Sequence, residues 1–152
     1  MKAVAKLRKY QLPEFLSGVV EQFAYDRWLA RKAAGHVKRD RRRGNAVAMI
    51  ESYKVAIHKA VGLCGGIDDY TGEKLRWDLI GKYSNVESQS GRRAYRATLS
   101  LLPTVDHVGD GLGAASFRIC GLRTNDAKSD FGDDEFIEFC QRVIAHWASK
   151  KR

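Results

Sequence analysis

The glycine-rich segment 109–113 constrains the fold most, because it forms a flexible connection between two short runs of strand-forming residues. The first run begins at Tyr95, and Pro103 near its end indicates an interruption or a position at the edge of a sheet. The second run contains Phe117 and Ile119. The pattern predicts two strands that fold back on each other as a hairpin.

Helical spacing of apolar residues precedes this hairpin. A first helix is expected from about residue 13 to the low thirties, with Pro13 in its first turn. A basic stretch follows the first helix, and Gly44 can end it. Asn45 can cap a second helix, which stops near Gly62. The apolar positions of the second helix are Val47, Ile50, Ile57 and Val61.

A last helix is expected to start near Asp133, after the second strand. Acidic residues in its first turn and basic residues in its last turn complement the helix dipole. Its apolar stripe is expected to be buried and consists of Phe136, Phe139, Cys140, Val143 and Trp147. The polar segments 64–72 and 81–93 are expected to be a turn and a surface loop.

These elements predict an α+β chain: basic N-terminal helices, then a hairpin-plus-helix module, and a C-terminal helix. A division into a basic helical part, residues 1–62, and a second part, residues 63–152, follows from the change of character near Cys64. The three cysteines form no C-x-x-C pair, so no structural zinc is expected. No apolar run approaches the ~18 residues of a membrane span. A cytoplasmic protein with no membrane partner is therefore expected.

The excess positive charge lies in the N-terminal part of the chain. The net charge is +9, and residues 1–60 carry 14 Lys and Arg against 5 Asp and Glu. Basic side chains that neutralise phosphates release condensed counterions, so a nucleic acid is the expected partner, with DNA favoured over RNA. The candidate backbone contacts are Arg39, Arg41, Arg42 and Arg43, whereas His36 in the same stretch is expected to be solvated. A homodimer is left open.

Two segments carry residues suited to phosphodiester hydrolysis. Asp106 and His107 end the first strand, and Asn125 follows the second. Carboxylate and amide oxygens are ligands for a hard divalent cation, and imidazole can take a proton from water near neutral pH. Adjacent strand residues point to opposite faces, so Asp106 and His107 would have to straddle one phosphate or lie on a distorted strand.

The same residues resemble the HNH nuclease family. Val105-Asp106-His107-Val108 is similar to its D-H-hydrophobic element, and Asn125-Asp126-Ala127-Lys128 to its N-x-x-K element. The turn at Tyr70-Thr71-Gly72 also looks like an upstream turn of many members. The resemblance covers residues 64–147 and implies a ββα-metal fold.

The resemblance also implies roles for these residues. Asp106 and Asn125 would be metal ligands, with Mg²⁺ expected and Mn²⁺ as a substitute, and His107 would be the general base. Lys128 would contact phosphate or support the helix turn. Many members carry a further asparagine that holds the histidine loop. The corresponding stretch 114–117 has none, and Ser116 would have to take its place.

The expected function is therefore a metal-dependent endonuclease, in which Arg123 either grips the scissile phosphate or forms a surface ion pair. Two alternatives remain open. One is a nucleic-acid-binding protein that keeps the HNH fold without cutting, as the missing asparagine suggests. The other is a scaffold whose basic helices bind an acidic protein.

Overall fold

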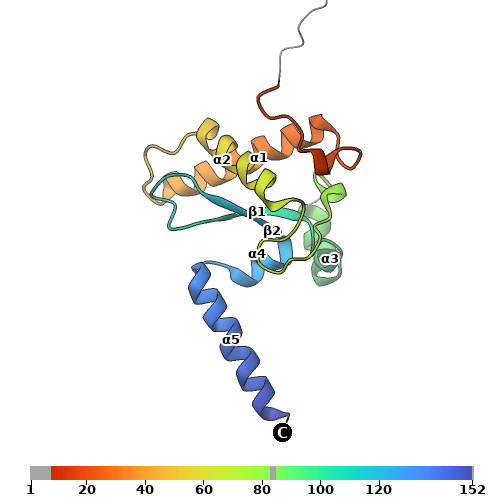
Figure 1. The fold of residues 1–152 in the computed structure, drawn as a ribbon, viewed down its shortest axis with the longest axis vertical. Helices are drawn as coiled ribbons and strands as arrows, with labels where there is room; N and C mark the ends of the chain where they lie inside the picture. Colours follow the sequence, from red (N-terminus) through yellow and green to blue (C-terminus); the bar gives the residue numbers. More distant parts are fainter. Residues whose placement is uncertain (1–7, 83–84, 152) are drawn as a thin grey trace, which may run out of the picture.

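A computed structural model describes residues 8–82 and 85–151. The protein is an α+β chain in which helices surround one two-stranded antiparallel sheet (Figure 1). The described elements are the 3-10 turn η1 (Glu14–Leu16), α1 (Gln22–Arg42), α2 (Ile50–Cys64), the 3-10 turn η2 (Trp77–Leu79), α3 (Asn85–Thr98), β1 (Pro103–His107), β2 (Phe117–Gly121), α4 (Leu122–Lys128) and α5 (Asp133–Lys150).

The hairpin is confirmed, but its register places Asp106 and His107 at the end where β2 begins. Asn125 follows the opposite end of β2, where Gly121 pairs with Pro103. Strands β1 and β2 pair antiparallel, with Asp106 opposite Arg118 and His107 opposite Phe117. Pro103 is the first residue of β1, where its missing N–H costs no ladder hydrogen bond. Helix α4 follows β2 directly and packs on both strands.

Helices α1 and α2 lie on one side of the hairpin, and α4 lies on the other (Figure 1). The buried face of α1 repeats at helical spacing from Tyr25 through Leu29 and Ala33 to Val37. Ile57 of α2 and Ile119 of β2 are fully buried in the same core. The core thus joins the N-terminal helices to the hairpin.

A buried carboxylate ties the turn after α2 to the joint between β2 and α4. Asp68 is 2% exposed, and its oxygens accept hydrogen bonds from the backbone N–H groups of Tyr70, Thr71 and Gly121 and from the Thr124 hydroxyl. The expected turn at 64–72 is confirmed, since Gly65 ends α2 in the left-handed region, at φ 56°.

Several expected boundaries were wrong. Residues 14–16 form only a 3-10 turn, and α1 begins at Gln22 and includes the basic stretch as far as Arg42. The next helix starts at Ile50 instead of after Asn45, so Val47 and Ile50 are exposed while Ile57 and Val61 are buried.

The expected loop at 81–93 and the strand expected from Tyr95 were also wrong. Residues 85–98 form the amphipathic helix α3, and only the run from Pro103 is extended. Residues 83–84 of that stretch lie outside the described part of the chain.

The buried stripe expected on the last helix was wrong as well. Helix α5 forms as expected, but none of its residues is buried, and it projects away from the body of the protein (Figure 1).

Among the described residues, no helix combines the length and the apolar character needed to cross a membrane.

Candidate functional site

Asp106 and His107 point to opposite faces of the hairpin, as the alternation of side chains along a strand requires. The imidazole of His107 lies against Asp40 at the end of α1. The carboxylate of Asp106 instead faces Tyr70 and Lys128, on the side of α4. The two residues therefore belong to two separate polar clusters.

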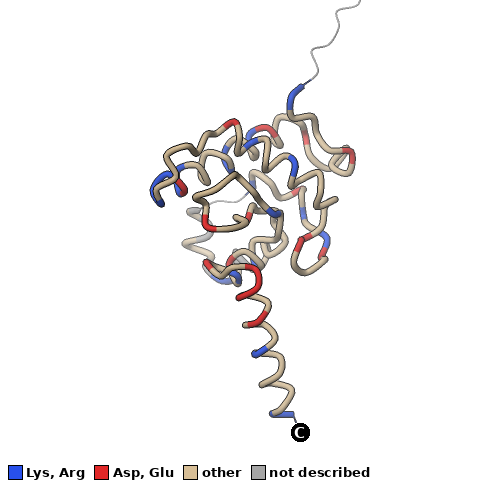
Figure 2. Tube along the Cα trace, turned by 60° about the vertical axis from the view of Figure 1, so that its left-hand side comes forward, with Lys and Arg blue, Asp and Glu red and all other residues tan. Residues whose placement is uncertain are grey.

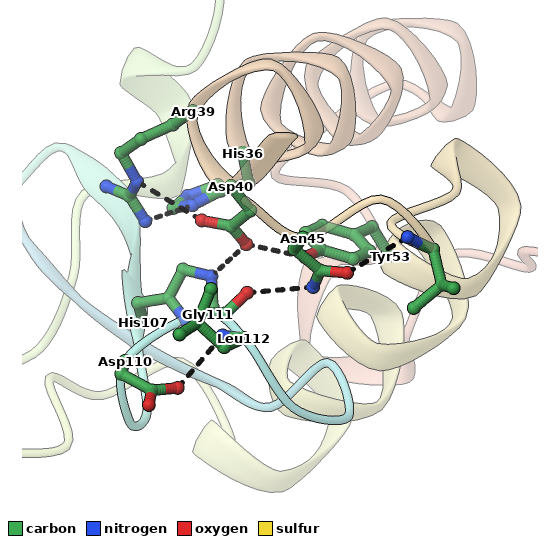
Figure 3. A network of polar contacts seen from close by, with 10 residues as sticks. His36, Arg39, Asp40, Asn45, Tyr53, His107, Asp110, Gly111 and Leu112 are labelled. Atoms are coloured by element: carbon green, nitrogen blue, oxygen red, sulfur yellow. Dashed lines mark hydrogen bonds and ion pairs between the residues drawn. The ribbon is translucent and has the colours of Figure 1, made fainter. Parts of the chain in front are cut away.

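The first cluster holds His107 against a buried carboxylate (Figure 3). Its Nε2 atom lies 2.5 Å from Oδ2 of Asp40, and the His107 side chain is only 8% exposed. The ring packs against Phe117, with ring centroids 4.8 Å apart, and against His36, with centroids 5.5 Å apart. The imidazole therefore has one defined orientation.

Asp40 is ionised although its side chain is fully buried. Burial alone would raise the pKa of Asp40, but hydrogen bonds from Tyr53 and His107 hold it below its usual value. The Tyr53 hydroxyl donates to Oδ2 over 2.5 Å, which together with burial raises the pKa of Tyr53 to about 12. The Arg39 guanidinium, 3.7 Å away, adds compensating positive charge.

The ionised carboxylate decides which nitrogen of His107 carries the proton. Because Asp40 can only accept, Nε2 of His107 must donate to it. In the neutral imidazole, Nδ1 then holds the lone pair. No described group makes a hydrogen bond to this Nδ1 atom, which is itself buried. The arrangement is a carboxylate-oriented imidazole whose free nitrogen can accept a proton.

His36 lies beside this pair, and the expectation that it is solvated was wrong. It is 8% exposed on the buried face of α1. Its Nδ1 atom lies 2.8 Å from an Arg39 nitrogen, which can only donate. Burial and the positive charge of Arg39 lower the pKa of His36 to about 3. His36 is therefore neutral near pH 7.

The connection between the strands is attached to the end of α1. The Asn45 side chain donates to the carbonyl of Gly111 over 2.8 Å. A Cβ atom on Gly111 would lie only 2.8 Å from Oδ1 of Asp40, and the residue has a φ of +80°. The connection after His107 thus lies directly against Asp40 (Figure 3).

The second cluster surrounds Asp106 with hydrogen-bond donors. Its Oδ2 atom accepts from the Tyr70 hydroxyl at 2.6 Å and lies 3.1 Å from Nζ of Lys128. The Tyr70 hydroxyl also lies 2.9 Å from Asp133, which pairs with Arg118. Burial and the neighbouring carboxylates raise the pKa of Tyr70 well above its usual value. Lys128 is 4% exposed and neutralises the buried charge of Asp106.

This second cluster limits the expected cation site. Among the residues that the structure describes, no group of three or more His, Cys, Asp or Glu side chains could hold a metal ion. A divalent cation beside Asp106 would meet the ammonium of Lys128. The arrangement fits a cation only if Lys128 first moves away. Asn125 is half-buried in α4, three residues before Lys128, and the pairing of Asp106 with Asn125 stays a prediction.

The expected phosphate contacts lie in different surroundings. Arg39 is half-buried against His36, and Arg41 donates twice to the carbonyl of Ala48, over 3.0 and 2.8 Å. Arg41, Arg42, Arg43 and Arg123 are exposed, whereas Lys128 is buried. Ser116, which was expected to support the histidine loop, is exposed, and its carbonyl accepts from the N–H of Val108.

Sequence reasoning missed Asp40, which is the central residue of the first cluster. Two signals could have found it. It is the only acidic residue in the stretch from Lys38 to Arg43. It also continues the helical spacing of the buried residues Ala33 and Val37. A charged residue in line with an apolar stripe indicates a buried partner.

No family model, no curated protein and no solved structure matches the chain.

Proposed function

We propose that the protein is a nuclease that hydrolyses phosphodiester bonds, with DNA favoured over RNA, and that His107 is its general base. The observation that carries the proposal is the Asp40–His107 pair at the end of β1, which leaves Nδ1 of the imidazole without a described partner. Asp106 and His107 lie on β1, and Asn125 and Lys128 lie on α4, which follows β2. This order supports the proposal further.

His107 would accept the proton of the attacking water at Nδ1. The imidazolium that forms would be stabilised by the Asp40 carboxylate, which is a fixed charge already in contact with the opposite nitrogen. Because Nδ1 is buried, water would reach it only after a local rearrangement of the surrounding residues. Gly109 and Gly111 in the connection after His107 both have positive φ angles, which other residues rarely adopt.

The basic end of α1 would hold the nucleic-acid backbone near this base. Arg42 and Arg43 are exposed there, and Asn45 immediately beyond them contacts the connection that follows His107. Arg123 on α4 would hold a separate part of the backbone, because α4 lies on the other face of the hairpin from α1. These arginines would contact the charged phosphates and would not recognise particular bases.

The divalent cation that the HNH resemblance implies would have Asp106 and Asn125 as its ligands. Lys128 would have to leave Asp106 for this to occur, so Lys128 competes with the cation. Titration calorimetry with Mg²⁺ on the wild type and on Lys128→Met tests this point. The variant is expected to bind Mg²⁺ more tightly, and equal or weaker binding would contradict the assignment of Asp106 as a ligand.

Nicking of supercoiled plasmid by the purified full chain, with Mg²⁺ or Mn²⁺, tests the activity itself. Nicking is expected to disappear in EDTA and in His107→Gln. The matched control is His146→Gln, which changes an exposed histidine of α5 and is expected to nick normally. Nicking that survives His107→Gln, in a variant with a native circular dichroism spectrum, would overturn the proposal.

A second candidate function is nucleic-acid binding without cleavage. The pairing of Lys128 with Asp106 favours it, because the position expected for a catalytic cation holds an ammonium. This candidate requires salt-sensitive retention of DNA, no cleavage in any metal, and no change in retention in His107→Gln.

A further inference from the structure

Helix α5 leaves most of an apolar face without a partner among the described residues. Its base is contacted, where Phe136 packs against Tyr70 and Phe131. It spans Asp133–Lys150, about 27 Å at the usual helical rise, and none of its residues is buried. Large apolar side chains along it are exposed: Ile137 50%, Phe139 41%, Val143 43%, Ile144 67% and Trp147 60%. An apolar face of this size marks an interaction surface.

The apolar residues repeat at alternating spacings of four and three. The stripe runs through Phe136, Cys140, Val143 and Trp147, which is the pattern of a helix that packs along another helix. The pattern is symmetric about the midpoint between residues 141 and 142. A second α5 in antiparallel orientation would therefore place Phe136 against the partner's Trp147 and Cys140 against the partner's Val143.

The charges of α5 favour the same orientation. Its first turn holds Asp133, Asp134 and Glu135, and its last holds Lys150, with Lys151 following (Figure 2). Antiparallel pairing puts each acidic end beside the basic end of the other helix. The two helix dipoles then point in opposite directions, which is the favourable arrangement. Parallel pairing would place like charges side by side at both ends.

A groove at the base of α5 offers a place for the basic end of the second helix. Its volume is about 810 Å³, and it lies between α5 and the body of the protein. Its lining carries four acidic residues, Asp69, Glu73, Asp133 and Asp134, against two basic ones, Arg118 and Arg123, beside the apolar Ile137 and Ile144. The charge and the apolar character of the groove both suit the partner's Trp147 and Lys150.

We propose that two copies of this chain associate through antiparallel packing of their α5 helices. The two interfaces are identical by symmetry, as in other twofold dimers. The bodies of the two chains lie at opposite ends of the helix pair. The proposal does not depend on the nuclease activity.

Light scattering on the full chain measures the association. The expected mass is twice the 17.1 kDa of one chain. The double variant Val143→Ser/Trp147→Ser, on the apolar stripe, is expected to be monomeric. The control Glu138→Ser/Arg142→Ser also replaces two side chains by serine, but on the opposite face and without altering the net charge. It is expected to stay dimeric. None of these four side chains is buried, so both variants should keep the native circular dichroism spectrum.

Disulfide cross-linking decides the orientation. In Val143→Cys, oxidation is expected to link Cys140 of one chain to position 143 of the other, as peptide mass spectrometry can identify. The wild type is expected to form no Cys140–Cys140 link, because an antiparallel pair does not place these residues opposite each other. A single-chain mass for the wild type at every concentration, or a Cys140–Cys140 link in it, would overturn the proposal.

Discussion

At the scale of single residues, the candidate site depends on two buried carboxylates that are each compensated by specific partners. Asp40 accepts from Tyr53 and His107. Asp106 accepts from Tyr70 and forms an ion pair with Lys128. A buried charge without such partners would be strongly destabilising. The donors therefore fix the positions of both residues and, through them, the orientation of His107.

Asp40→Ala removes the acceptor of two buried donors. We expect it to lower the free energy of unfolding by about 3–5 kcal/mol, because the Tyr53 hydroxyl and His107 are left without a partner in the interior. Urea denaturation of the variant measures this decrease. Asp130→Ala, at an exposed position, is the control and should stay within about 0.5 kcal/mol of the wild type. Equal decreases in both variants would contradict the structural role of Asp40.

Acid should destabilise the protein in part through His36. Its pKa is about 3 in the folded protein and about 6.5 in the unfolded chain, so the unfolded chain binds the proton first. The stabilisation is fully present above pH ~6.5 and is lost as the pH falls towards ~3, by about 1.4 kcal/mol per pH unit for one proton. Burial lowers the pKa of His58 too and adds a slope of the same sign.

His36→Gln should remove part of this pH dependence. Glutamine can still accept from Arg39 but does not titrate. Chemical denaturation of both proteins between pH 7 and pH 4 measures the two slopes. The same slope in both would mean that His36 does not resist protonation in the folded protein.

At the scale of elements, the parts that were predicted correctly have strong local patterns. The glycine-rich connection identified the hairpin, and the charges at both ends identified α5. Helix α3 was missed because its residues are mostly polar and include a glycine, and such residues also suit a loop. The start of α1 was missed because Gly18, at φ +75°, allows a turn between residues 17 and 21 that the apolar spacing does not reveal.

Sequence reasoning placed Asp106 and His107 correctly at the end of a strand, but not their partners. Asp40 lies 67 residues before His107, so their contact depends on how α1 crosses the hairpin. No local pattern contains that information. The burial of the α5 stripe was predicted wrongly for a related reason, because a pattern shows that a face needs a partner without showing where the partner is.

The contact between the hairpin connection and α1 depends on the absence of a side chain at Gly111. Gly111→Ala should lower the free energy of unfolding by about 1–3 kcal/mol, because of the positive φ and the approach to Asp40. Gly113→Ala is the matched control, since its Cβ would meet nothing within 4 Å. Thermal unfolding of both variants compares them, and a destabilisation in Gly113→Ala as large as in Gly111→Ala would contradict this interpretation.

At the scale of the whole molecule, charge and apolar surface are separated. The excess of Lys and Arg lies in residues 1–60, while α5 extends from the other end of the body (Figure 2). A polyanion would therefore bind near α1, and a second chain would bind along α5. The two surfaces can be tested independently.

Salt dependence of DNA binding distinguishes these surfaces. Arg42→Ala/Arg43→Ala should reduce the slope of log affinity against log salt by about 2, because each phosphate that is no longer neutralised lowers the slope by about 0.9. Lys150→Ala/Lys151→Ala removes the same charge from the end of α5 and should leave the slope nearly unchanged. Fluorescence anisotropy with a short duplex over a series of salt concentrations measures both. Equal slopes in the two variants would exclude the end of α1 as a specific phosphate-binding surface.

The central claim is that an ionised Asp40 orients the imidazole of His107 as a base. The most direct test is to determine which ring nitrogen of His107 carries the proton. Long-range ¹H–¹⁵N spectra of protein with labelled histidine distinguish the two neutral tautomers. In the neutral form of His107, we predict that the proton lies on Nε2, with Nδ1 unprotonated, and that this signal changes in Asp40→Asn. A His107 protonated on Nδ1 in the wild type, with no response to Asp40→Asn, would contradict the claim.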